Sequence, residues 1–149
     1  MMNKKKILGI VFGVFALSQL IPVDKTNPPS NSEIVVEKEV KLILKRACYD
    51  CHSNKTIWPA YSKIFPISFA ISKHVKNGRE ELNFSEWEAF TAKKKNKKAS
   101  EVIEEIESGD MPPPYYKIFH SNSKLNQSDI QVLKNWALKI EKDFEKEKK

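Results

Sequence analysis

The feature that most constrains this chain is the pentapeptide Cys48-Tyr49-Asp50-Cys51-His52, which has the spacing C-x-x-C-H. On one helical turn, this spacing brings two thiols and an imidazole close together. Each thiol can form a thioether with a vinyl group of the same porphyrin, and the adjacent imidazole can bind its iron. The motif therefore predicts one covalently attached haem c, bound through Cys48 and Cys51, with His52 as the proximal iron ligand.

Two other chemistries use similar spacings. The chain has two cysteines, both in the motif, so neither is left for a structural disulfide or a four-thiolate zinc site. A thioredoxin-like redox pair requires strand–helix–strand surroundings, and no such pattern flanks the motif. A zinc site built on Cys48, Cys51 and His52 would need one of the two remaining histidines as fourth ligand. We favour haem over both alternatives.

The N-terminal segment bears on export. Residues 4–6 are lysines, and the seventeen residues 7–23, ILGIVFGVFALSQLIPV, carry no charge. A basic stretch before an apolar one is typical of a Sec-type signal peptide or signal anchor. The apolar stretch is short for a membrane span, and no A-x-A cleavage site is evident. We expect an uncleaved anchor, or alternatively a cleaved signal peptide. In either case the domain would lie on the periplasmic side of the bacterial inner membrane.

A polar tether, DKTNPPS, follows this segment and marks a domain boundary. We therefore divide the chain into residues 1–28, a signal or anchor with its tether, and residues 29–149, one haem-binding domain. The net charge of +7 owes much to residues 4–6 and to the lysine run at 93–98. That run predicts a solvated loop, or a docking patch for an acidic redox partner or anionic lipid. Nucleic acid is not an expected partner of an exported chain.

Apolar residues recur at helical spacing along the domain, and no convincing strand is found. The pattern predicts an all-α fold, a small cytochrome c-like domain around one haem. A first helix should run from about residue 33 to about residue 50, with Ser32 as its N-cap and the haem motif at its end. A second helix should begin at Pro66 and end at Gly78.

Two later helices follow from the same reasoning. One is expected over residues 99–108, closed by Gly109. The last is expected over residues 125–144, with Asn126 or Ser128 as its N-cap.

Three possibilities exist for the sixth coordination position of the haem iron. Met111 precedes three prolines, which exclude helix and stiffen the loop, and its thioether is a suitable ligand. Alternatively, Met111 is an ordinary apolar residue packed under this loop. His74, on the expected inward face of the second helix, is the other candidate ligand, although a lone histidine there is more often a packed core residue. An open position is the third solution.

Three further side chains lie in segments expected near the haem edge or on the surface. Trp58 and Tyr61 follow the motif in an irregular stretch, where they would hydrogen-bond a haem propionate or simply pack against neighbouring residues. His120 lies beside the polar sequence SNS and is expected at the surface.

The order of these pieces resembles the layout of class I cytochromes c: C-x-x-C-H ending the first helix, a late methionine–proline loop, and a terminal helix. More closely, the stretch from about Thr26 to Trp136 resembles the bacterial haem-binding domain family of small CxxCH proteins. The matching segments are VDKTNPP, CYDCHSNKTIWPAYSKI, HVKNGREELNFSEW, the helix before GDMPP, and the terminal helix. The resemblance implies an all-helical, anchored or periplasmic haem protein that binds haem through Cys48, Cys51 and His52. It leaves the sixth ligand open.

These features favour a monohaem carrier of single electrons. Ligation by His52 and Met111 would close both axial positions, and the sequence shows no additional acid–base constellation, so we do not expect an enzyme. The expected partners are a redox protein and, through the N-terminal segment, the membrane. The alternative is a haem-based sensor or ligand-binding module with a displaceable sixth ligand. Peroxidase-like catalysis is least favoured, because no distal Arg/His pair is evident.

Overall fold

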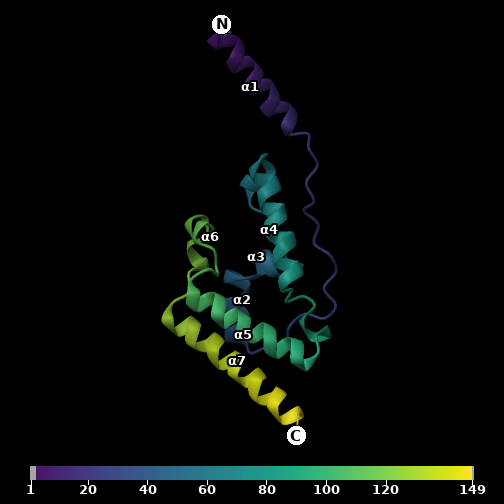
Figure 1. Cartoon of the computed structure of the whole chain (residues 1–149), viewed down its shortest axis with the longest axis vertical. Helices are drawn as coiled ribbons and strands as arrows, with labels where there is room; N and C mark the ends of the chain where they lie inside the picture. Colours follow the sequence, from purple (N-terminus) through teal and green to yellow (C-terminus); the bar gives the residue numbers. More distant parts are fainter. Residues whose placement is uncertain (1–2, 149) are drawn as a thin grey trace.

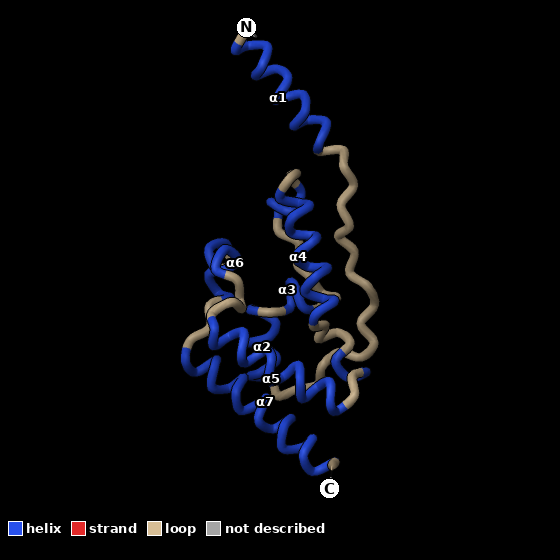
Figure 2. The backbone as a smooth tube through the Cα atoms, in the orientation of Figure 1, coloured by secondary structure: helices blue, strands red, loops and turns tan. Residues whose placement is uncertain are grey.

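The computed structural model describes residues 3–148, and the regular structure in this range is entirely helical (Figure 2). The α-helices are α1 Lys4–Ser18, α2 Lys38–Ala47, α3 Tyr49–His52, α4 Ile67–Glu81, α5 Ala92–Ser108, α6 Pro114–Phe119 and α7 Gln127–Glu147. Three short 3₁₀ helices are η1 Ala60–Lys63, η2 Trp87–Ala89 and η3 Ser121–Ser123. The prediction of an all-α fold is confirmed for these residues.

The core lies where α5 and α7 pack side by side and α7 also contacts α2 (Figure 1). Leu44 and Leu133 are fully buried at its centre. The rings of Trp87 and Trp136 lie 5.5 Å apart and close the cluster on the η2 side. This layer supports α3, which carries the C-x-x-C-H motif directly after α2.

Helix α7 begins as one of the two sequence alternatives predicts. Asn126 is the N-cap: its side chain accepts from the Asp129 backbone N–H, and the Asp129 carboxylate accepts from the Asn126 N–H. This reciprocal capping box satisfies two backbone donors at the helix start. Ser128 lies inside the helix, so it is not the cap.

The lysine run 93–98 is helical, so the predicted loop is wrong. It forms the first part of α5, which Thr91 caps by accepting from the Lys94 backbone N–H. Lysine is a good helix former, and Lys98 pairs with Glu101 at 2.8 Å and with Glu81 of α4. The end of α5 is as predicted, because Gly109 adopts φ +85° in the left-handed region.

The first helix of the domain begins at Lys38, five residues later than predicted, and Ser32 is not its N-cap. Long-range contacts hold the preceding residues extended. The Ile34 backbone N–H donates to Phe84 O at 2.8 Å, and the Glu33 carboxylate accepts from Lys41 at 2.7 Å and Tyr49 at 3.1 Å. These tertiary bonds override the local helical pattern.

The sequence predicts one extended loop for the three prolines, and this prediction is wrong. Pro114 occupies the first turn of α6, where its missing N–H and fixed φ are tolerated. Between α5 and α6, only residues 109–113 are non-helical. This short link carries Met111 from the end of α5 to α6.

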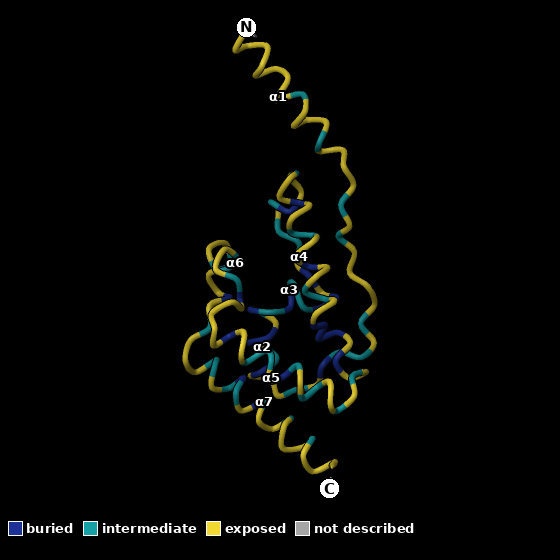
Figure 3. Tube along the Cα trace, in the orientation of Figure 1, coloured by how far each residue is buried: buried dark blue, intermediate teal, exposed yellow. Residues whose placement is uncertain are grey.

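Helix α1 projects from the domain and is exposed along its length (Figure 3). Helix α1 ends before Pro22, because the residue that precedes a proline disfavours helical backbone angles. With 15 residues it is about 22 Å long. Within residues 3–148, no helix has the length and apolarity needed to cross a membrane. The expected membrane span is therefore not among the described helices.

The tether after α1 is bound along α4 rather than left free (Figure 1). Ser72 Oγ of α4 donates to Asp24 O at 2.6 Å. One guanidinium of α4, that of Arg79, donates to Thr26 O at 2.9 Å and to Asn27 Oδ1 at 2.7 Å. The polar composition of the tether thus supplies acceptors for α4.

Candidate functional site

Within the C-x-x-C-H motif, Tyr49–His52 form the single turn α3, and Cys48 is its N-cap. The carbonyl of Cys48 accepts from the backbone N–H groups of Cys51 at 3.2 Å and His52 at 2.9 Å. Both thiols are free and half-buried, and they line one cavity together with His52. Burial raises the pKa of Cys48 to about 12 and that of Cys51 to about 11, so both thiols are protonated at neutral pH.

Two carbonyls of the α4 region fix the imidazole of His52. Its Nδ1 lies 2.9 Å from Gly78 O and 3.1 Å from Leu82 O. Because carbonyl oxygens only accept, Nδ1 carries the proton and Nε2 keeps a free lone pair. Burial lowers the pKa of the ring, which favours neutral imidazole. Metal-binding histidines are commonly oriented by such a bond from the second nitrogen.

Gly78 allows α4 to approach the motif closely. A Cβ at this position would lie 2.7 Å from Cys51 O and 3.2 Å from Cys51 Cβ, so a side chain there requires the backbone to move. The prediction that Gly78 ends the helix is wrong, because α4 continues to Glu81. Sequence reasoning missed this role; the available signal was a glycine within a helical pattern.

A cavity of about 640 Å³ opens beside α3, between α4, α5 and the segment from Met111 to Tyr116. Its size is within the range that proteins use for cofactors. It brings together most of the predicted site residues, namely Cys48, Cys51, His52, His74 and Met111. Its apolar lining comes from several elements: Ala47, Leu82, Phe84, Val102, Ile106, Pro112, Pro113 and Leu125. Apolar walls, two thiols and one neutral imidazole fit a covalently bound haem.

The two candidate sixth ligands come from different walls of the cavity. Met111 follows α5, where its backbone N–H donates to Glu105 O at 3.0 Å, and its side chain is 37% exposed. His74 belongs to α4 and lines the same cavity, although it is exposed. Its Nδ1 lies 3.3 Å from the hydroxyl of Tyr115 on α6. That contact links α4 to α6 beside the cavity.

Trp58 and Tyr61 do not line this cavity. The Tyr61 hydroxyl lies 2.6 Å from His120 Nε2, and Trp58 Nε1 is buried without a hydrogen-bond partner among the described residues. Hydrogen bonding of either residue to a propionate stays a prediction. The prediction that His120 is a surface residue is wrong, because its half-buried ring stacks on Tyr116 at 4.1 Å.

Asp50, the last residue between the two cysteines, joins the motif to α6. Its Oδ1 accepts from the Ile57 backbone N–H at 3.0 Å, and its Oδ2 accepts from the Tyr116 hydroxyl at 2.6 Å. Burial and this hydrogen bond raise the pKa of Tyr116, so its hydroxyl remains a donor. The contact holds α6 against the cavity, and no local sequence pattern marks it.

The charged side chains around the cavity are mostly acidic, although the whole chain is basic. The cavity lining holds one lysine, Lys98, which pairs with Glu81 and Glu101. Burial acts to lower the pKa of Lys98, but the bonds to these two carboxylates outweigh it and raise the pKa. The acidic residues of the lining are Asp50, Glu81, Glu101, Glu104 and Glu105. One member of the lysine run thus contributes to the cavity.

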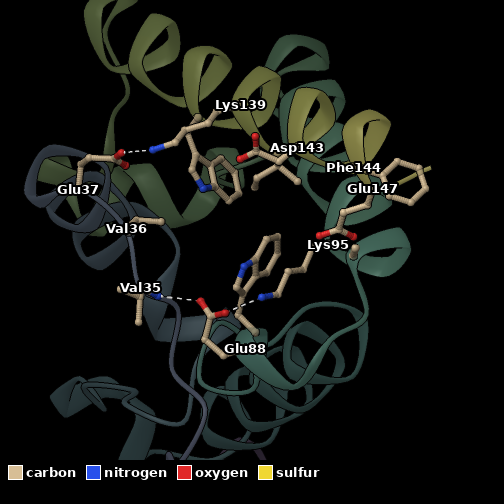
Figure 4. Close-up of a pocket in the computed structure, with 13 residues that line it drawn as sticks. Val35, Val36, Glu37, Glu88, Lys95, Lys139, Asp143, Phe144 and Glu147 are labelled. Carbon is tan, nitrogen blue, oxygen red and sulfur yellow. Dashed lines mark hydrogen bonds and ion pairs between the residues drawn. The ribbon is translucent and has the colours of Figure 1, made fainter. Parts of the chain in front are cut away.

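A second hollow, of about 450 Å³, lies between α7 and the segments around residues 35–37 and 87–95 (Figure 4). Ion pairs Glu37–Lys139 and Glu88–Lys95, both at 2.5 Å, cross its rim. Its described lining includes Trp87 and Trp136 and holds no cysteine, histidine or methionine. The predicted haem-binding residues therefore belong to the other cavity.

The comparisons with known proteins agree with this assignment. A family model described as a haem-binding domain matches residues 13–139, a range that includes the motif, Gly78 and Met111. Neither the curated proteins nor the solved structures gave a match. Because the family model covers most of the sequence, the chain belongs to the haem-binding domain family.

Proposed function

We propose that this haem-binding domain carries one covalently bound haem c and transfers single electrons. The observation that carries the proposal is the orientation of His52, whose Nδ1–H is held by Gly78 O and Leu82 O while its cavity also contains both thiols. Cys48 and Cys51 would form the thioethers, and His52 Nε2 would bind iron. Haem supplies a one-electron iron couple when bound.

Met111 is the sixth ligand in this proposal. His52 and Met111 would hold the haem iron from opposite walls of the cavity. His52 is held by α4, and His74 belongs to that same helix. Met111 comes from the wall built by α5 and α6, which supports it as the partner of His52. A thioether also favours reduced iron and raises the potential.

The proposed role is that of a carrier rather than an enzyme. Its redox partner would present a basic surface, because the cavity lining is acidic and complementary charge guides docking. This replaces the acidic partner that the lysine run alone predicted, since that run is helical and partly paired. The competing role, a haem sensor or ligand-binding module, requires a sixth ligand that an external ligand displaces. We further propose that the domain lies on the periplasmic side of the inner membrane.

Expression with a c-type maturation system tests the attachment. The wild type should retain haem through denaturing electrophoresis and show a mass one haem above that of the polypeptide. Cys48→Ser with Cys51→Ser should abolish retention, whereas His74→Ala should leave it intact. A wild type whose haem is released on denaturation would refute covalent attachment. A redox titration should then follow a one-electron curve.

A further inference from the structure

After Lys4, Lys5 and Lys6, the N-terminal helix α1 is exposed and apolar on every side. None of its residues is buried, and Leu8, Phe12 and Leu17 are 71%, 71% and 68% exposed. A helix that is hydrophobic all round is normally surrounded by apolar material. The described domain does not cover α1 (Figure 3), so the helix needs an external partner.

The end of α1 is held at one point of the domain, the tip formed by η1 and the start of α4 (Figure 1). The side-chain amide of Gln19 bonds the backbone of Phe65 in both directions. The Phe65 N–H donates to Gln19 Oε1 at 3.0 Å, and Gln19 Nε2 donates to Phe65 O at 3.4 Å. Lys25 Nζ donates to Ser62 O at 3.2 Å. These bonds fix the place where α1 leaves the domain.

The same tip exposes large apolar side chains. Ile64, Ile67 and Phe69 are 47%, 45% and 57% exposed. The surface continues onto α6, because the Phe119 ring lies 5.6 Å from that of Tyr61 in η1. We call these exposed side chains the tip patch: Ile64, Ile67, Phe69, Ile118 and Phe119. It is an apolar surface next to an apolar helix.

The charges around the tip patch are mostly basic, although Asp24 of the tether is bound beside it at Ser72. The sequence holds no Asp or Glu from His52 to Arg79, a stretch that includes Lys63, Lys73 and Lys76. The segment 111–128, which contains α6, likewise has Lys117 and Lys124 and no acidic residue. Exposed apolar side chains among lysines complement an interface of acyl chains and anionic headgroups.

We infer that the tip patch docks on the surface of an anionic lipid bilayer, which α1 also contacts. The bound tether then sets how the domain stands on the membrane, with the α4 tip towards the lipid. A second copy of the chain suits this surface less well, because two lysine-rich faces repel. The inference goes beyond the proposed electron transfer and does not depend on haem ligation.

Hydrogen exchange measured by mass spectrometry on the full-length holoprotein tests the docking directly. Vesicles containing phosphatidylglycerol should slow exchange in residues 60–72 and in α1, but not in α7. Phosphatidylcholine vesicles should slow the tip much less. Slowing confined to α1 would overturn the inference. Slowing of the tip without vesicles, as protein concentration rises, would assign the surface to a second copy and also overturn it.

Vesicle flotation of matched variants measures the contribution of the patch. Ile67→Ser with Phe69→Ser should weaken binding to phosphatidylglycerol vesicles about tenfold or more, since two apolar side chains leave the interface. Leu42→Ser with Leu138→Ser is the control, because these exposed leucines lie on α2 and α7. Equal binding by the two variants would contradict the docking. Haem content of each sample is recorded separately, so failure of the haem proposal is visible independently.

Discussion

The two walls of the cavity beside α3 are built differently. On the motif wall, α3 and α4 are joined through backbone acceptors: Gly78 O and Leu82 O orient His52, and Arg79 donates to Ser53 O. On the opposite wall, Met111 is 37% exposed and tied to α5 through its backbone N–H. The motif wall fixes the orientation of His52, the proposed proximal ligand, whereas the other wall leaves the position of Met111, the proposed sixth ligand, adjustable.

Arg79 shows how strongly the motif wall is connected. Its guanidinium makes four hydrogen bonds of 2.7–2.9 Å to the segment after the motif and to the tether, with Ser53 O, Thr56 Oγ1, Thr26 O and Asn27 Oδ1 as acceptors. Hydrogen bonds to charged groups are among the stronger ones. Arg79 thus ties α4 to the segment after the motif and to the tether through one side chain.

Gly78→Ala should have the largest effect on the contrast between the two walls, because it inserts a methyl group into the motif wall. The added Cβ would lie 2.7 Å from the Cys51 carbonyl oxygen. We expect the free energy of unfolding, measured by urea titration, to fall by about 3 kcal/mol. Gly13→Ala is the matched control, since nothing lies within 4 Å of its added Cβ. Equal losses in the two variants would refute the close-approach argument.

Arg79→Ala should have the next largest effect, because it leaves several acceptors without their donor. We expect the free energy of unfolding to fall by about 2 kcal/mol. Lys76→Ala, one turn earlier on α4, serves as control, because Lys76 is exposed and reaches only Glu80, at 3.9 Å. A comparable loss in the Lys76 variant would show that the motif wall does not depend on Arg79.

Met111→Ala probes the opposite wall and should change the iron more than the fold. The side chain is 37% exposed, so we expect the free energy of unfolding to change by less than about 1 kcal/mol. The ferrous protein should gain carbon monoxide binding, and the reduction potential should fall. His74→Ala should change neither. The reverse pattern would identify His74 as the ligand, and carbon monoxide binding by the wild type would favour a sensor.

Glu33→Gln should have the smallest effect of the series, and it should lower the free energy of unfolding near neutral pH while changing it little in acid. Burial acts to raise the pKa of Glu33, but hydrogen bonds from Lys41, Lys55 and Tyr49 outweigh it and lower the pKa from 4.5 to about 2. A carboxyl whose pKa is lower in the folded state stabilises the fold above its unfolded pKa and loses this effect as pH falls.

The free energy of unfolding should therefore decline between pH 4.5 and about 2, and Glu33→Gln should flatten that decline. Glu141→Gln, at an exposed position of α7, should leave it unchanged. A decline of the same size in the wild type and Glu33→Gln would show that Glu33 does not tie the motif wall through Tyr49.

Sequence reasoning predicted the parts of the site that depend on short-range spacing. Cys48, Cys51 and His52 share a turn because their spacing requires it, and Met111 reaches the same cavity from the end of α5. The Asn126 cap was also a local signal. The turn of the motif and the Asn126 cap can be predicted from neighbouring residues alone, whereas the place of Met111 in the cavity also depends on the packing of α5.

Contacts between distant segments account for what the sequence did not predict. The Ile34 backbone N–H donates to Phe84 O, so the first helix of the domain begins later than predicted. Asp50 accepts a hydrogen bond from Tyr116, 66 residues away. No periodic pattern in the sequence predicts that bond. The lysine run was predicted as a loop because its charge was considered before its helix propensity and its partner Glu81.

The close approach at Gly78 has a consequence for recognising related chains. Gly78 lies 26 residues after His52, and its place against the Cys51 carbonyl has no volume for a side chain. The pentapeptide alone is a weak identifier, whereas C-x-x-C-H followed at this distance by glycine encodes both the ligand and the helix that orients it. A chain that keeps the pentapeptide but carries a larger residue at that distance must orient its histidine by a different helix packing.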